Sequence, residues 1–461
     1  MIMENFDVVV IGGGPGGYVA AIRAAQLGQK TALIEKEHLG GICLNWGCIP
    51  TKALLKSAEL YQKMKHSEEY GISAGNVGFD LQKIVKRSRD ISGKLVGGIA
   101  GLLKKNKVTV IEGAAKIESP TQISVDGKTT VKAKNIIIAT GARARVLEGF
   151  EPNGGNIWSY REALVPKTTP KSMVVVGSGA IGVEFASFYN AIGVDVTVLE
   201  AADRILPVED SEISSMARKA FESKGIKFKT GVVLKEQKSG KNSVEIIFEH
   251  GGKKEVIKSE ILLMAVGISG NVENIGLEKI KVKLDRGHIV TNGLMQTSQK
   301  GVYAIGDVAG APWLAHKASH EGVIAAEMIA GKKPHQITKT NIPGCTYSSP
   351  QIASVGLTEE AAKADGREIK IGRFPFYGNA KAMILGDGDG MIKTIFDAKT
   401  GEMLGSHMIG SDVTELIQGY VVAKEMEGTE EDLMNTIFPH PTLSEMMYES
   451  VLQAYNKQIH I

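Results

Sequence analysis

Short apolar runs bounded by glycines alternate along this chain with longer segments whose apolar residues recur at helical spacing. Runs this short are typical of buried strands, and the longer segments are typical of amphipathic helices. Strands that alternate with helices favour an α/β fold with a doubly wound parallel sheet. The succession of strand, helix and strand occurs at residues 7–11, 18–27 and 31–34, and again at residues 173–176, 183–192 and 195–199.

A glycine-rich turn joins the first strand to the helix in both successions. The turns read Gly-Gly-Gly-Pro-Gly-Gly from residue 12 and Gly-Ser-Gly-Ala-Ile-Gly from residue 177, so both match G-x-G-x-x-G. An acid follows 23 positions after the first glycine in each (35 − 12 and 200 − 177). Such a turn lets a pyrophosphate approach a helix N-terminus, while the acid accepts ribose hydroxyls. The chain therefore has two candidate dinucleotide sites, formed by Gly12, Gly14, Gly17 and Glu35 and by Gly177, Gly179, Gly182 and Glu200.

The residues that follow Glu200 indicate which dinucleotide the second site prefers. A carboxylate at this position would repel the 2′-phosphate of NADP. The next residues are two alanines and Asp203 rather than a cluster of arginines, and we interpret Arg204 as a surface residue. We therefore predict that the second site binds NAD.

Two of the three cysteines, Cys43 and Cys48, lie in a glycine-rich stretch shortly after the first dinucleotide motif. A turn can bring cysteines at this spacing within disulfide range. We expect a helix over residues 52–65, which leaves Cys48 just before a helix N-terminus, where the thiolate is favoured. A redox-active disulfide beside a flavin is the favoured interpretation, so we assign FAD to the first site. Half of a zinc site and an inert structural pair are the alternatives, and Cys345 is interpreted as an ordinary buried residue.

Composition and charge exclude several classes of function. The chain has 54 Lys and Arg against 51 Asp and Glu, which gives no basis for nucleic-acid binding. No apolar run approaches the roughly 18 residues of a membrane span, and the first strand has no charged and apolar leader before it. Three cysteines in 461 residues indicate a reducing compartment, where a disulfide is catalytic. We expect a soluble cytoplasmic protein with no nucleic-acid, membrane or metal partner.

The rest of the chain adds further strands and helices. Residues 80–105 have the spacing of a long amphipathic helix, and Gly251-Gly252 is typical of a hairpin turn. After Pro343 the pattern changes, which indicates a separate mixed α/β domain. Further strands are predicted at residues 108–111, 135–139, 261–266, 301–305, 352–355, 391–396 and 403–409.

With these motifs in order, the chain resembles the dihydrolipoamide dehydrogenase branch of the flavoprotein disulfide reductases from end to end. The resemblance implies two Rossmann-like dinucleotide-binding domains and a mixed α/β dimerisation domain. The implied domains are an FAD domain at residues 1–148, an NAD domain at 149–270, a central domain at 271–340 and an interface domain at 341–461. The motifs that carry the resemblance are both glycine turns, the cysteine segment, Ala139-Thr140-Gly141, Tyr303-Ala304-Ile305-Gly306-Asp307, and His440-Pro441-Thr442 with Ser444-Glu445.

The resemblance also implies roles for the residues near the cysteines. Cys43 resembles the thiol that exchanges with the substrate, and Cys48 resembles the thiolate in charge-transfer contact with the flavin. Lys52 resembles the lysine beside the reactive ring nitrogen of the flavin, where it would pair with Glu184. Trp46 departs from the family pattern, since a small aliphatic residue is usual there, so the resemblance does not extend to the packing and redox poise of the disulfide.

A histidine near the C-terminal end completes the implied site. His440 resembles a base from the partner subunit that deprotonates a substrate thiol, and Glu445 would orient its ring. Phe438 stands where some relatives have a second histidine. The remaining matches are Gly113, Gly141, Asp307 and Ala315 along FAD, and Val232 and Gly267 along NAD.

The implied reaction oxidises dihydrolipoamide to lipoamide and reduces NAD to NADH. The implied partners are a second copy of the chain and the lipoyl domains of a 2-oxo acid dehydrogenase or glycine-cleavage complex. Sister enzymes are the first alternative, but a glutathione reductase should have arginines after Glu200, a mercuric reductase should end in paired cysteines, and a transhydrogenase should lack the cysteine pair. The second alternative is a scaffold subunit without turnover, and the intact cysteines, His440 and Glu445 argue against it.

Overall fold

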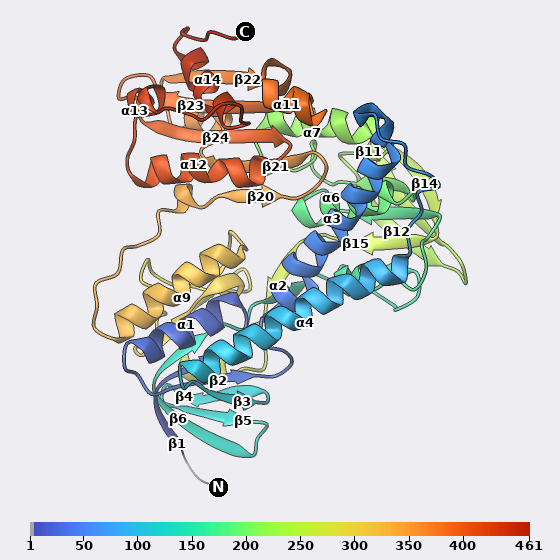
Figure 1. The fold of residues 1–461 in the computed structure, drawn as a ribbon. Helices are drawn as coiled ribbons and strands as arrows, with labels where there is room; N and C mark the ends of the chain where they lie inside the picture. The colour runs from blue at the N-terminus through green and yellow to red at the C-terminus, as the bar shows by residue number, and fades with distance from the viewer. Residues whose placement is uncertain (1–3) are drawn as a thin grey trace. The chain divides into compact units, whose positions relative to one another are not determined.

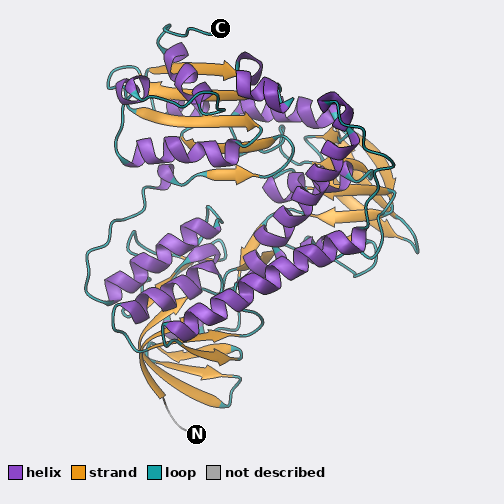
Figure 2. Ribbon diagram, in the orientation of Figure 1, coloured by secondary structure: helices purple, strands orange, loops and turns teal. Residues whose placement is uncertain are grey.

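The computed structural model describes residues 4–461, which form two compact units (Figure 1). The first unit comprises the chain up to Leu54 together with Gln82–Arg145 and Gly267–Ile337. The second unit comprises Leu55–Leu81, Val146–Val266 and Thr338–Ile461. Both units combine helices with strands (Figure 2), which confirms the α/β class predicted from the sequence.

The first unit is built on a sheet whose central strands are parallel. The strand order is β3-β2-β1-β6, and β19 pairs with the end of β6, which is the doubly wound order of a dinucleotide-binding domain. β4 and β5 continue from β6 as antiparallel strands. The strands of this unit are β1 (Glu4–Ile11), β2 (Thr31–Glu35), β3 (Thr109–Glu112), β4 (Ala115–Ser119), β5 (Gln122–Val125), β6 (Thr129–Ile138), β7 (Ala142–Ala144), β16 (Ile268–Gly270), β17 (Leu284–Asp285), β18 (His288–Ile289) and β19 (Val302–Ala304).

Helices cover the sheet of the first unit, and α1 packs directly on α9 (Figure 1). Glycines permit this approach, because a Cβ at Gly16 would lie 2.9 Å from Ala318 O and one at Gly322 would lie 2.6 Å from Gly16 O. The helices are α1 (Pro15–Gln26), α2 (Gly41–Trp46), α3 (Cys48–Lys65), which continues into the second unit, α4 (Leu81–Lys105), α8 (Leu277–Ile280), the short η2 (Gly306–Ala309) and α9 (Ala315–Ile329).

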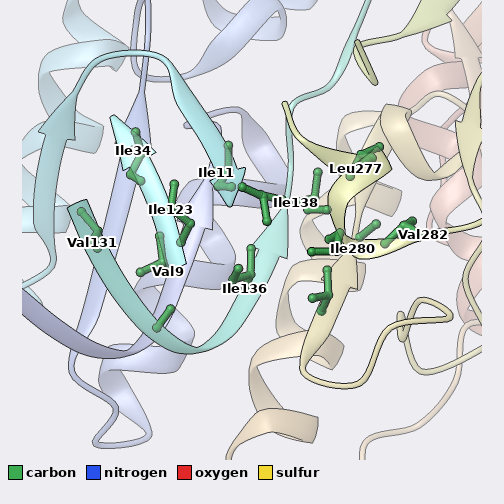
Figure 3. Close-up of a cluster of buried hydrophobic side chains, with 14 of the residues drawn as sticks. Val9, Ile11, Ile34, Ile123, Val131, Ile136, Ile138, Leu277, Ile280 and Val282 are labelled. Atoms are coloured by element: carbon green, nitrogen blue, oxygen red, sulfur yellow. The ribbon is translucent and has the colours of Figure 1, made fainter. Parts of the chain in front are cut away.

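Apolar side chains from this sheet form a core with α8 (Figure 3). Val9 and Ile136 are fully buried on neighbouring strands, and Leu277 of α8 packs into the same cluster. The core thereby joins strands from the beginning of the chain to a segment more than two hundred residues later. This joins residues around 277–304 to the sheet that positions the first glycine turn.

The second unit repeats the plan of the first. Its parallel sheet has the order β11-β10-β9-β15-β8, and β12-β13-β14 form an antiparallel sheet with the predicted turn at Gly251-Gly252 between β13 and β14. The elements are η1 (Ser67–Tyr70), β8 (Ile157–Trp158), α5 (Tyr160–Leu164), β9 (Ser172–Val176), α6 (Ala180–Ala191), β10 (Asp195–Leu199), α7 (Ser211–Ser223), β11 (Lys227–Lys229), β12 (Val233–Ser239), β13 (Val244–His250), β14 (Lys253–Ser259) and β15 (Ile261–Met264).

The C-terminal part of the second unit contains a five-stranded antiparallel sheet with helices, and its status as a separate domain stays a prediction. Its strand order is β20-β21-β24-β23-β22, and β23 and β24 are buried along their full length. The elements are η3 (Lys339–Asn341), β20 (Gly344–Thr346), β21 (Gln351–Gly356), α10 (Glu359–Ala364), β22 (Ile369–Pro375), η4 (Phe376–Gly378), α11 (Ala380–Leu385), β23 (Met391–Asp397), β24 (Met403–Gly410), α12 (Val413–Glu425), α13 (Glu430–Asn435) and α14 (Glu445–Ala454).

The cysteine segment differs from its sequence-based prediction. We expected a turn at the cysteines and a helix from residue 52, but α2 contains Cys43 and α3 begins at Cys48 itself. Pro50 lies in the first turn of α3, where its missing N–H costs no helical hydrogen bond. The helix can therefore begin before the proline.

Candidate active site

The first glycine turn has a shape that suits a pyrophosphate. Gly12 has a φ of 105°, and a Cβ there would lie 2.3 Å from Ala139 O, while one at Gly17 would lie 1.9 Å from Gly12 O. Strand, turn and helix are thus packed too closely for side chains. A Cβ at Gly14, before α1, would have Gly41 Cα as its nearest neighbour at 4.0 Å. The N–H groups at the start of α1 therefore face open space that suits an anion.

The second glycine turn repeats this geometry position by position. Gly177 has a φ of 101°, and Cβ atoms at Gly177 and Gly182 would lie 2.4 Å from Ala265 O and 2.0 Å from Gly177 O. Gly179 precedes α6 with a φ of −67°, against −68° at the corresponding glycine before α1. A Cβ at Gly179 would meet none of the described atoms within 4 Å. The second turn therefore has the same open space at a helix N-terminus.

Glu35 is held beside the first turn by backbone donors. Its Oε2 accepts a hydrogen bond from Gly13 N at 2.6 Å, and its Oε1 accepts one from Glu37 N at 2.7 Å. Gly113 N, after the neighbouring strand β3, donates to Glu35 O at 2.9 Å. The predicted contact residues Glu35 and Gly113 therefore lie together at the carboxyl ends of parallel strands, where dinucleotides bind in this class of sheet.

Glu200 is held in the same way beside the second turn. Its Oε2 accepts from Ser178 N at 2.7 Å and its Oε1 accepts from Ala202 N at 2.8 Å, while Val232 N donates to Glu200 O at 2.9 Å. Its Oε2 also accepts a hydrogen bond from the Ser178 hydroxyl at 2.7 Å. This contact of Ser178 was not predicted. The only sign of it in the sequence is a hydroxyl-bearing residue between the first two glycines of the turn.

The arginine nearest to Glu200 is engaged with an acid. Arg204 donates to both carboxylate oxygens of Glu360, at 2.9 and 3.0 Å, and these hydrogen bonds raise its pKa. A guanidinium in a two-pronged ion pair is a poor candidate for binding a 2′-phosphate. The pairing agrees with the interpretation of Arg204 as a surface residue that does not bind the nucleotide.

Cys43 and Cys48 lie at the junction of α2 and α3. Their sulfur atoms are 2.6 Å apart and are not joined by a disulfide bond. A disulfide bond is about 2.05 Å long, so it can form with a small movement. Thr51 supports the junction, since its hydroxyl donates to Gly47 O at 2.7 Å. The structure thus brings together the two cysteines whose spacing in the sequence indicated a pair.

The electrostatics of the pair distinguish its two thiols. The hydrogen bond to Cys48 and burial raise the pKa of Cys43 well above its ordinary value, although Lys52 acts to lower it. Cys48 is the first residue of α3, and a helix N-terminus favours a thiolate over a thiol. Burial, and the charge that Cys43 carries when ionised, raise the pKa of Tyr18 in α1. Sequence reasoning did not find Tyr18, which follows the glycine turn directly.

Trp46 lies between the cysteines and is covered by an arginine. The guanidinium of Arg89, from α4, lies over the Trp46 ring at 4.5 Å, and it also donates to the backbone oxygen of Asn45. Asn45 in turn donates to Leu39 O and Gly41 O, each at 2.9 Å. The unusual tryptophan is therefore part of a network that holds the cysteine segment against α4. Arg89 carried no local signal in the sequence, since it lies in an ordinary amphipathic helix.

Asp307 lies in the first unit beside a buried ion pair. Lys317 and Glu321 are joined at 2.8 Å with side chains only 7% and 6% exposed, and Glu321 also accepts from Gly306 N at 2.6 Å. Burial raises the pKa of Asp307, while Lys317 acts in the opposite direction. Ala315 is the first residue of α9, so this predicted contact residue lies at a helix N-terminus.

His440 and Glu445 form a pair in the second unit. His440 Nδ1 lies 2.9 Å from Glu445 Oε1, and Thr442 N donates to Glu445 Oε2 at 2.9 Å. Burial acts to raise the pKa of Glu445, but the hydrogen bonds from Thr442 and His440 outweigh it and hold the pKa below its usual value. The His440 side chain is 72% exposed, so the ring is held in place yet open to another molecule.

Three further predicted site residues are Glu184, Gly141 and Gly267. Glu184 of α6 is 4% exposed, and its Oε1 accepts a hydrogen bond from Tyr347 N at 2.9 Å. Its pairing with Lys52 stays a prediction. Glycines with positive φ stand at the two other predicted contact positions, Gly141 (69°) and Gly267 (97°).

Within residues 4–461, none of the helices combines the length and hydropathy that a membrane span requires. In the same part of the chain, no group of three or more His, Cys, Asp or Glu side chains is arranged to hold a metal ion.

Comparison with known proteins identifies the family. The model of the pyridine nucleotide-disulphide oxidoreductases matches residues 6–322, and the model of their dimerisation domain matches residues 342–451. The chain belongs to the pyridine nucleotide-disulphide oxidoreductase family. It is an oxidoreductase with FAD and NAD as cofactors, as predicted, and it carries the family's dimerisation domain.

Individual relatives of this oxidoreductase match over their full length. It is 53% identical to the dihydrolipoyl dehydrogenase of Rhizobium etli, with 98% of this chain and 99% of the relative covered. It is also 53% identical to the dihydrolipoyl dehydrogenase of Zymomonas mobilis, with 99% of each covered. Among solved structures, LpdA from Mycobacterium tuberculosis matches with a TM-score of 0.90 and 26% identity, covering 98% of this chain and 99% of that one.

Proposed function

We propose that this oxidoreductase converts dihydrolipoyl groups to lipoyl groups and reduces NAD to NADH. The observation that carries the proposal is the adjacent sulfur pair of Cys43 and Cys48, in a chain similar to dihydrolipoyl dehydrogenases over its full length. A dithiol substrate is the natural partner for a cycling disulfide, because thiol–disulfide exchange needs no other reagent.

The two glycine turns fit the two cofactors. Gly12, Gly14 and Gly17 would cradle the pyrophosphate of FAD, since the turn leaves open space at the start of α1. Glu35 would accept hydrogen bonds from the ribose hydroxyls. Asp307 would lie at the ribityl chain and the phosphates, and would accept hydrogen bonds from the ribityl hydroxyls. Gly113, Gly141 and Ala315 would lie along the same cofactor, with Lys52 beside the reactive ring.

The second turn would hold NAD in the same manner. Gly177, Gly179 and Gly182 would receive its pyrophosphate, and Glu200 would accept the hydroxyls of its adenosine ribose. Val232 and Gly267 would lie along the bound nucleotide. FAD, when bound, supplies the hydride chemistry by which two electrons pass from the cysteine pair to NAD.

The side chains of the protein carry out the thiol chemistry. The partner subunit's His440 accepts a proton from one dihydrolipoyl thiol, and Glu445 stabilises the positive ring. The resulting thiolate attacks the Cys43 sulfur of the disulfide, and Cys48 leaves as a thiolate. The second dihydrolipoyl thiol, once deprotonated, attacks the substrate sulfur of the mixed disulfide. Lipoyl disulfide is released, Cys43 takes up a proton, and the pair has gained two electrons.

The proposed partners follow from this chemistry. A homodimer brings His440 of the partner subunit to each cysteine pair, and the dimerisation domain supports this arrangement. The substrate would be a lipoyl domain of a 2-oxo acid dehydrogenase or glycine-cleavage complex. A cytoplasmic location is inferred because three cysteines in 461 residues are typical of a reducing compartment.

An assay of the purified holoenzyme tests the proposal. We expect rapid reduction of NAD by dihydrolipoamide, which Cys43→Ser and Cys48→Ser should each abolish. Cys345→Ser, which alters the third cysteine, should leave the rate unchanged. Reduction of glutathione disulfide by NADPH at a higher rate than the lipoamide reaction would overturn the proposal.

A further inference from the structure

The two dinucleotide turns share every backbone contact to their acids but differ in one hydroxyl. In both turns the residue after the first glycine donates its N–H to Oε2 of the acid, and the residue two positions after the acid donates to Oε1. The first turn has Gly13 at the former position, whereas the second has Ser178. The Ser178 hydroxyl adds a third hydrogen bond to Glu200, at 2.7 Å. The first turn therefore serves as an internal reference for what the hydroxyl adds.

Ser178 itself is firmly held. Its side chain is 0% exposed, and its backbone oxygen accepts a hydrogen bond from Leu206 N at 3.1 Å. Leu206 has a φ of 46° and is itself buried, so the loop after Glu200 folds back on the turn. The hydroxyl is thus aimed at Glu200 by its surroundings and has no access to water as a competing partner.

Three donors restrict the carboxylate of Glu200. Two of them converge on Oε2, so the carboxylate cannot turn aside without losing both hydrogen bonds. A 2′-phosphate needs the opposite, because the negatively charged carboxylate would have to move away from it. The hydroxyl therefore increases the cost of accepting NADP and pre-orients the acceptor for the ribose diol of NAD.

We propose that Ser178 is a specificity-determining residue that fixes Glu200 and thereby strengthens the preference for NAD over NADP. The proposal rests on the proposed function, because it requires NAD to bind at this turn. Ser178 acts through Glu200, so it is a positioning residue and leaves the thiol chemistry unchanged.

Two variants remove the hydroxyl in different ways. Ser178→Ala removes it and keeps the Cβ, and Ser178→Gly installs the residue that the first turn carries at this position. Ser178→Thr retains the hydroxyl and tests rescue. Ser214→Ala is a matched control, since the Ser214 hydroxyl is also buried in this unit and donates to Ile205 O at 2.6 Å.

The experiment measures dissociation constants of NAD and NADP by calorimetry on the holoenzymes, and kcat and KM with each nucleotide. We expect the NAD to NADP ratio of kcat/KM to fall about fivefold to tenfold in both hydroxyl-free variants, the size expected for part of one charge-assisted hydrogen bond. The amount of bound FAD should be unchanged, because Ser178 belongs to the other dinucleotide turn. Ser178→Thr should recover most of the ratio, and Ser214→Ala should match the unaltered enzyme.

The outcomes separate this inference from the proposed function. If the unaltered enzyme prefers NAD and the ratio is unchanged in Ser178→Ala and Ser178→Gly, Ser178 has no role in specificity. A fall in thermal stability without a change of ratio would likewise reduce Ser178 to a structural residue. Equal use of both nucleotides by the unaltered enzyme would overturn the assignment of NAD and this inference with it.

Discussion

The imidazole of His440 lies 2.9 Å from the carboxylate of Glu445, in a pair that one backbone N–H fixes from the other side. The acid is only five residues further along the chain, and it begins α14. A short loop and a helix start thus orient a histidine whose ring is largely exposed. This relationship gives the clearest test of the proposed base.

Glu445→Gln should slow the oxidation of dihydrolipoamide by about 10²-fold, at the lower end of what a positioned base contributes. The amide cannot stabilise the positive ring that forms when the thiol is deprotonated. Oxidation of NADH by an artificial acceptor bypasses that proton transfer and should be unchanged. His460→Gln is the matched control, because His460 forms a similar pair with Glu449 at 2.6 Å. Equal losses in both variants would indicate a structural effect.

Mixed dimers test whether the base acts on the opposite subunit. Homodimers of Cys43→Ser and of His440→Gln should each be nearly inactive, since one lacks the nucleophile and the other the base. A heterodimer has one site with both defects and one with neither, so about half of a dimer's activity should return. Native mass spectrometry can establish subunit exchange. Exchange without recovered activity would show that each subunit uses its own histidine.

Glu200→Gln should reduce the preference for NAD, because removing the charge removes the repulsion of a 2′-phosphate. We expect kcat/KM to fall with NAD and to rise or hold with NADP. Glu35→Gln is the reciprocal variant, since Glu35 has the same backbone donors at the first turn. It should weaken retention of FAD and leave the nucleotide ratio unaltered. A changed nucleotide ratio in Glu35→Gln would contradict the assignment of the two sites.

Lys393 is a buried cation whose removal should destabilise the second unit. Its side chain is 1% exposed and contacts Asp210 at 2.9 Å and Glu359 at 2.8 Å. Burial acts to lower the pKa of Lys393, but the carboxylates outweigh it and raise that pKa. Lys393→Met should cost about 3–5 kcal/mol at neutral pH, because it leaves the fully buried carboxylate of Asp210 without its cation. Lys227→Met, which removes an exposed pair, should cost at most about 1 kcal/mol.

The loss of stability in Lys393→Met should become smaller as the pH falls. Burial acts to raise the pKa of Asp210, but Lys393 outweighs it and holds that pKa below its usual value. Its stabilisation is therefore present at neutral pH and is lost as pH falls through the lowered pKa. In Lys393→Met the carboxylate has no such support and takes up a proton more readily. Denaturant unfolding should show the difference between the two proteins narrowing from pH 7 toward pH 4.

Glu209 should behave in the opposite way. Burial raises its pKa to about 6, and its Oε2 has no hydrogen-bond partner among the described residues. Because the pKa of Glu209 is raised, the stabilisation that this group contributes is fully present at pH values below its ordinary pKa. That stabilisation is lost as the pH rises through about 6. Glu209→Gln should therefore stabilise the protein by about 2 kcal/mol at pH 8 and by little at pH 4.5. Unfolding midpoints across this range would check it, and a pH-independent difference would contradict it.

The sequence by itself determined the two dinucleotide turns and the cysteine pair. Periodicity reports local structure, and both strand–turn–helix successions form as their patterns indicate. The acids at Glu35 and Glu200 were predictable because each ends a strand next to the strand that carries its turn. The spacing also indicated that Cys43 and Cys48 can meet, although the helices around them were misjudged because a proline in a first helical turn leaves little trace in the pattern.

Only the tertiary structure showed which distant side chains support these motifs. Arg89 covers Trp46 from a helix forty residues away, and its own segment has the ordinary pattern of an amphipathic helix. The ion pairs of Lys393 join residues that are far apart in the chain, so no spacing could have revealed them. The Ser178 hydroxyl meets Glu200 because parallel strands bring a turn and a strand end together. Local patterns encode the elements, while the contacts between elements depend on how those elements pack.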